Sequence, residues 1–106
     1  MPHTDSAAEG PFVELLNNKA DLQVVTATMH DLVAISFISH PMAHKTQAEM
    51  KRRGEILISA FRVMRKDKGF SQARTLAMLP YALKHALDNP TTPWEPPPQT
   101  NLYRAG

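Results

Sequence analysis

Five basic residues recur through the middle of the chain at a spacing suited to nucleic-acid binding. They are Lys45, Lys51, Arg52, Arg62 and Lys66, and Glu55 is the acidic residue that shares their expected helix face. Such a stripe can follow a phosphate backbone, because each neutralised phosphate releases condensed counterions. The same stripe can equally be the solvated side of an amphipathic helix, or can pair with the acidic N-terminal third of the chain.

A second nucleic-acid hypothesis concerns the segment after Ser71. Gln72, Arg74 and Thr75 would stand at the start of a helix, where a recognition helix presents polar side chains to base edges. Pro80 follows soon afterwards, and the helix expected before this segment is too long for a helix-turn-helix motif. Any nucleic-acid binding is therefore expected to use phosphates rather than bases.

The histidines are weak candidates for metal binding or phosphotransfer. His40 and His44 are four residues apart, a spacing that places two ligands on one helix face. However, His40 precedes a proline, and the chain has no His-Glu-x-x-His pattern. A phosphotransfer histidine would need a lysine and a small residue one turn further on, where Gln47-Ala48 stands instead. We therefore predict no metal site and no cofactor.

The chain is also poorly equipped for covalent catalysis. It has no cysteine, no G-x-S-x-G elbow and no glycine-rich phosphate loop. Ser36 and Ser39 are near His40 only in sequence. Because 106 residues leave little room for a deep, walled active site, we predict a protein that is not an enzyme.

The elements that position these residues are predicted to be helices. Apolar spacing and break signals place them at about 11–17, 19–38, 41–67 and 72–88. Asn18 and Ser71 are the expected N-caps, Pro41 is the expected first residue of the long helix, and Gly69 suits a left-handed C-cap. Pro80 should bend the last helix.

The helix expected at 19–38 has two apolar faces. One consists of Leu22, Val25, Met29, Leu32 and Val33, and the nearly opposite one of Val24, Ala27, Ala34, Ile35 and Ile38. Both faces favour burial, and a chain this short has few elements to cover both. We therefore expect a second copy of the protein to cover one of them.

The long helix has one apolar seam, in which Ala43, Met50, Leu57 and Met64 repeat every seven residues. Gly54 lies on the same seam and costs about 1 kcal/mol relative to alanine in a helix. We interpret Gly54 as allowing the close approach of a partner helix, although a tolerated glycine is an equal alternative. The predicted interface residues are Met50, Gly54, Leu57, Phe61 and Trp94.

The two ends of the chain are expected to lie outside the helical domain at 11–89. Residues 1–10 are predicted to be flexible. Residues 90–106 begin with a proline-rich stretch that favours polyproline II, so they are predicted to form an extended arm anchored by Trp94.

Composition indicates the compartment and the overall class. Residues 1–44 carry one basic residue against five acidic ones, a net charge of −4, whereas residues 45–74 carry nine against three, a net of +6. The absence of cysteine favours a reducing compartment. The N-terminus lacks a signal peptide and no run reaches 18 apolar residues, so we expect a cytoplasmic protein without membrane contact.

These features predict an all-α protein, an antiparallel bundle of three to four helices with a Pro-rich extended C-terminal arm. We expect a homodimer. The function we expect is that of a small regulatory or adaptor protein acting by protein–protein interaction. The alternative is a nucleic-acid-binding protein that places its basic helix face on the phosphate backbone.

Overall fold

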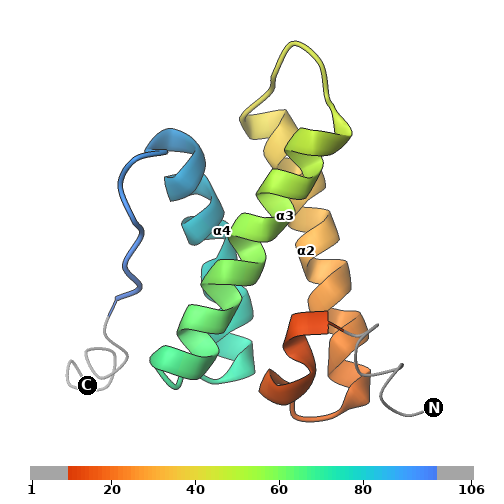
Figure 1. Ribbon diagram of the computed structural model, residues 1–106, viewed down its shortest axis with the longest axis vertical. Helices are drawn as coiled ribbons and strands as arrows, with labels where there is room; N and C mark the ends of the chain where they lie inside the picture. Colours follow the sequence, from red (N-terminus) through yellow and green to blue (C-terminus); the bar gives the residue numbers. More distant parts are fainter. Residues whose placement is uncertain (1–9, 98–106) are drawn as a thin grey trace.

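The computed structural model describes residues 10–97, and within that range every regular element is a helix (Figure 1). The elements are η1 (Gly10–Leu15), α2 (Lys19–Ser39), α3 (Gln47–Arg62), η2 (Val63–Asp67) and α4 (Gln72–Asp88). The prediction of an all-α protein is confirmed. Most of the predicted flexible N-terminus and the end of the predicted arm lie outside the described residues.

The start of α2 follows the sequence-based prediction. The Asn18 side chain accepts a hydrogen bond from the Asp21 amide, and the Asp21 carboxylate accepts one from the Asn18 amide, both at 3.2 Å. This reciprocal capping box satisfies two amides that the first helical turn leaves unpaired. The helix ends at Ser39, two residues before Pro41.

The start of the long helix differs from the prediction. α3 begins at Gln47, so the prediction that it begins at Pro41 is wrong, and Lys45 lies in the connecting loop. The physical reason is a better cap: the Thr46 hydroxyl accepts a hydrogen bond from the Glu49 amide at 3.1 Å. The chain reverses direction through this loop, between the upper ends of α2 and α3 in Figure 1.

The end of the long helix is a wider turn that periodicity did not predict. η2 has π-helical geometry, and its Met64 carbonyl accepts a hydrogen bond from the Phe70 amide at 2.9 Å. Gly69 follows with φ of +71°, the left-handed conformation expected of it, and Ser71 caps α4 through the Arg74 amide. The predicted boundary between the last two helices is thus confirmed.

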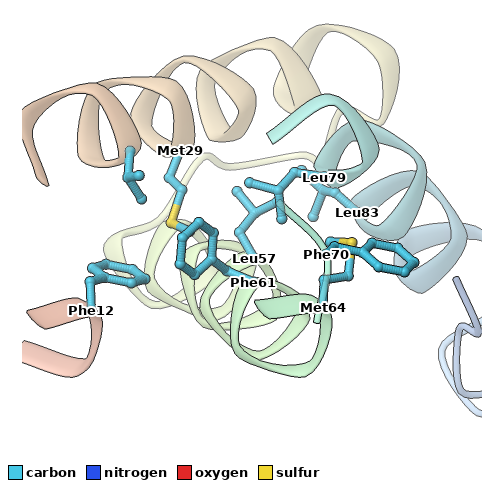
Figure 2. Packing of buried hydrophobic residues seen from close by; sticks show 9 residues of the cluster. Phe12, Met29, Leu57, Phe61, Met64, Phe70, Leu79 and Leu83 are labelled. Atoms are coloured by element: carbon cyan, nitrogen blue, oxygen red, sulfur yellow. The ribbon is translucent and has the colours of Figure 1, made fainter. Parts of the chain in front are cut away.

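The core lies on the apolar side of α3, which contacts α2, α4 and η1. Leu57, Phe61 and Met64 are fully buried, and Figure 2 shows Leu57 and Phe61 between Met29 of α2 and Leu79 of α4, with Met64 beside Phe70. Phe12 of η1 meets Phe61 edge-to-face, with ring centroids 5.2 Å apart. Since η1, α2 and α4 all contact this one apolar seam, α3 organises the fold.

Two arginines hold the helices and their connections together. Arg53 donates hydrogen bonds to Ser36 Oγ at 2.9 Å and to the His40 carbonyl at 3.0 Å, which fixes the end of α2 against α3. Arg65 donates to the Leu15 carbonyl at 2.8 Å and to the Phe70 carbonyl at 2.7 Å. The second arginine therefore joins η1 to the turn before α4.

Candidate interaction surfaces

The basic residues predicted to bind phosphates do not all lie on the long helix. Lys51, Arg52, Arg62 and Lys66 are exposed on the side of α3 and η2 away from the core. Lys45 is off the helix, where its ammonium lies 5.2 Å from the centroid of the Phe37 ring. Among the residues described, the basic surface therefore consists of four residues, with the exposed Glu55 between them.

Arg52 is already engaged within the chain. Its guanidinium donates two hydrogen bonds to Glu49, at 2.8 and 3.0 Å, and Arg53 donates a third to the same carboxylate at 2.8 Å. The hydrogen bonds from Arg52 and then Arg53 lower the pKa of Glu49 to about 2. The Glu49 carboxylate in turn raises the pKa of Arg52. A phosphate would have to compete with Glu49 for Arg52.

The outer face of α2 is an apolar surface that the described helices leave uncovered. Val24 is 52% exposed, Ile35 56% and Ile38 82%, and Ala27 and Ala34 between them are exposed as well. These are the residues of the second apolar face predicted from the sequence. The opposite face, with Val25 and Met29, packs on the core.

Length and composition alone would allow α2 to cross a membrane. Among the helices described it is the one that meets both requirements, and only 17% of its most apolar stretch is buried. The same two properties also occur in core helices and in signal sequences. Asp31 lies past the midpoint of this helix and is exposed on the outer face.

The structure separates the predicted interface residues into two groups. Leu57 and Phe61 are fully buried within the chain itself, so they are not on its surface. Met50 and Gly54 are half-buried and line a groove between α2 and α3. A Cβ placed on Gly54 meets no atom within 4 Å, so no helix among residues 10–97 approaches Gly54 as closely as the predicted partner helix would.

Two hollows adjoin these residues. The groove between α2 and α3 has a volume of about 490 Å³. The other, of about 600 Å³, lies between α3, α4 and residues 89–94. Trp94 lines the second hollow and packs half-buried against the core, and the Thr92 carbonyl accepts a hydrogen bond from His85 Nε2 at 2.9 Å. The start of the predicted arm thus lies along α4.

A cluster of polar residues joins the ends of α2 and α4, and sequence reasoning missed it. His40 Nε2 donates to the Asp88 carboxylate at 2.6 Å, and His40 Nδ1 lies 3.1 Å from Ser39 Oγ. The hydrogen bond from Lys84 and then that from His40 lower the pKa of Asp88. Asp88 is 48 residues from His40, so local spacing carried no signal.

The backbone that follows Ser39 offers this Ser-His-Asp cluster no free amide donor for acyl transfer. An oxyanion is stabilised by free backbone N–H groups beside the nucleophile. The His40 amide already donates to the Ser36 carbonyl at 2.7 Å, and Pro41 has no N–H. The geometry therefore favours a link between helix ends, with His40 capping α2.

The residues considered for base reading are turned inward. Thr75 is fully buried, with its hydroxyl donating to the Ser71 carbonyl at 2.8 Å. The Arg74 guanidinium lies 4.8 Å from the centroid of the Phe70 ring. Thr75 and Arg74 at the start of α4 therefore make contacts within the protein and are not presented to a DNA groove.

In residues 10–97, no three His, Asp or Glu side chains converge in a way that could hold a metal ion. Comparison with known proteins identifies no relative: no family model matches the chain, nor does any curated protein or solved structure.

Proposed function

We propose that this protein is a small helical regulatory or adaptor protein that acts by protein–protein interaction as a homodimer. The observation that carries the proposal is the uncovered apolar face of α2. Fully burying one aliphatic side chain contributes about 1.5–3 kcal/mol, so a helix with several exposed ones favours association. The bundle is proposed to be antiparallel, with residues 90–106 as an arm that adds a second contact surface.

The outer face of α2 has the spacing of a helix-pairing seam. Six exposed residues alternate at intervals of four and three along the helix: Ala20, Val24, Ala27, Asp31, Ala34 and Ile38. This is the heptad spacing with which two helices interlock their side chains. A second α2 is therefore a partner of matching shape.

Antiparallel pairing suits this seam better than parallel pairing. If the two helices cross near Met29, Ile38 of each copy faces Ala20 of the other, and Val24 faces Ala34. Large residues then meet small ones, as in a packed core. Asp31 faces Ala27 of the second copy, whereas parallel pairing would place two Asp31 carboxylates together. A two-fold axis across α2 satisfies these conditions.

A second copy covers this face better than a bilayer does. Asp31 would lie near the bilayer centre if α2 crossed a membrane, at a cost of about 2.5–3.5 kcal/mol. In addition, α2 is tied to α3 by the bonds from Arg53 to Ser36 and to His40. We therefore propose a cytoplasmic protein without membrane contact.

Sedimentation equilibrium tests the dimer. We expect wild-type protein at tens of micromolar to show twice the chain mass of 11.8 kDa. Ile38→Glu should give the monomer, whereas Tyr81→Glu, which alters an apolar residue on α4 that is 63% exposed, should leave the dimer intact. A wild-type monomer at 100 µM would contradict the proposal.

A pull-down from lysate with and without nuclease then tests the adaptor function. Partners captured by the wild type in both conditions, and lost when residues 90–106 are removed, support protein–protein interaction through the arm. Partners that disappear after nuclease treatment would instead favour nucleic-acid binding.

The second candidate function is backbone binding of nucleic acid, and one observation favours it. Lys51, Arg62 and Lys66 are exposed on one side of α3 and η2, and their side chains are free to reach a phosphate. Affinity for a generic duplex should fall steeply with salt. It should also disappear in the Arg52→Glu, Arg62→Glu, Lys66→Glu triple variant. If wild-type protein bound no duplex at low salt, this function would be excluded.

A further inference from the structure

The groove between α2 and α3 combines an apolar lining with positive charge. Its apolar part is formed by Phe12, Met29, Val33, Met50 and Ile58 around Gly54. Lys45 and Lys51 also line it, and both residues are exposed to solvent. None of its described lining residues is acidic. The volume of about 490 Å³ lies within the range of ligand pockets, about 300–1,000 Å³.

The two ends of the groove differ in character. Phe12 belongs to η1, beside the start of α2 at the lower end of the helix pair in Figure 1. Lys45 belongs to the loop that joins α2 to α3 at the upper end, and Lys51 lies in the second turn of α3. The groove is therefore apolar towards Phe12 and positively charged towards Lys45.

Gly54 gives the groove its depth. It lies between Met50 and Ile58 on α3, and a Cβ built there would enter open space. Glycine is unfavourable inside a helix, and among the residues described no packing contact gives a reason for it at this position. A ligand lying across α3 would supply that reason.

We propose that the groove binds a linear amphiphilic anion: an unbranched apolar chain with a carboxylate or phosphate head. The head lies between Lys45 and Lys51, and the chain runs past Gly54 towards Phe12. From residue 50 to residue 58 the α-helix rises about 12 Å, the length of roughly ten extended carbons. Met29 and Met50 suit such a chain, because thioether side chains adapt to irregular apolar shapes.

Titration calorimetry with ten-carbon probes tests the proposal. Decanoate and decyl phosphate, each in its monomeric range, should bind one to one, and each methylene removed should weaken binding about three- to fourfold. The matched probes are decanol, which lacks charge, and decyltrimethylammonium, which reverses it. We expect both to bind at least tenfold more weakly than decanoate.

Variants distinguish specific binding in the groove from non-specific binding elsewhere on the protein surface. Gly54→Leu fills the groove and should abolish decanoate binding, whereas Gly54→Ala adds a single methyl group and should keep it within about threefold. Lys51→Glu should weaken binding about tenfold. Lys68→Glu, which makes the same charge change at an exposed residue outside the groove, should not. Far-UV circular dichroism confirms that each variant remains folded.

Three kinds of result would overturn the proposal. The first is that neither anion binds. The second is that the cationic probe binds as tightly as decanoate, or that Gly54→Leu leaves binding unchanged. The third is that decanoate fails to bind while Gly54→Leu halves the mass of the wild-type particle, because the groove would then be a contact between copies of the chain.

Discussion

Neighbouring arginines on α3 share a partner but differ in burial. The Arg53 side chain is 5% exposed and the Arg52 side chain 51% exposed, and both donate to the Glu49 carboxylate. Arg53 also lies 4.0 Å from the centroid of the Phe37 ring. A charge paired away from water is costly to disturb, whereas an exposed pair contributes little.

This contrast makes a prediction for the two positions. Arg53→Ala should lower the free energy of unfolding by about 3 kcal/mol, because it leaves Ser36 Oγ and the His40 carbonyl without the Arg53 donor and removes one of the three hydrogen bonds to Glu49. Arg53→Lys should recover little of that loss, since an ammonium lacks the planar fork of donors. Urea denaturation gives both values.

Arg52→Ala is the matched control, because it removes the same kind of side chain from the same carboxylate. It should cost less than about 1 kcal/mol. Equal losses of unfolding free energy at the two positions would show that the burial of Arg53 does not increase its contribution to stability.

The roles of individual side chains were harder to predict from the sequence than the helices were. Charge counting treated Arg53 and Arg65 as two more cations of a basic segment, whereas both hold helices and turns together. Half of their acceptors are backbone carbonyls, those of Leu15, His40 and Phe70, which no residue pattern reveals. Only the fold brings these carbonyls within reach.

Among the elements, helix boundaries followed capping chemistry more closely than proline position. Asn18 and Ser71 were predicted as caps from side chains that can accept a nearby amide, and both do. Pro41 was predicted to begin α3 because proline suits a first helical position. The pattern Thr46-x-x-Glu49 was the stronger signal, and it was available in the sequence. The π-helical turn of η2 had no such signal.

The first turn of α3 should respond to acid. The pKa of Glu49 is about 2 in the folded chain against an ordinary value of 4.5, so the folded state favours the ionised form. The stabilisation from Glu49 is therefore fully present above pH 4.5 and is lost as the pH falls towards 2. We expect wild-type stability to fall between pH 4.5 and 2 more than that of Glu49→Gln.

Urea midpoints measured from pH 7 to pH 2 provide the test. The two proteins should converge at the acid end, since protonated glutamate and glutamine are both neutral. A constant difference across the range would indicate that Glu49 does not titrate in contact with Arg52 and Arg53.

At the scale of the whole molecule, the sequence showed that α2 has two apolar faces but not which one is internal. The structure buries the face with Val25, Met29 and Ser36, where Arg53 satisfies the Ser36 hydroxyl. The outer face carries Asp31, which is exposed in the single chain. Apolar periodicity alone could not separate the two faces, because that choice depends on polar partners from α3.

If the outer face of α2 joins two copies, thermal stability must depend on protein concentration, because folding and association are then linked. The midpoint temperature of the wild type should rise by about 3 °C for each tenfold increase in concentration. Ile38→Glu should show a midpoint that does not change with concentration. The midpoint temperature of this variant should equal that of highly diluted wild-type protein, because Ile38 is 82% exposed in the single chain and contributes little to its core. Calorimetric scans over a hundredfold range of concentration would show this, and a wild-type midpoint that stayed constant would mean that α2 does not pair with a second copy.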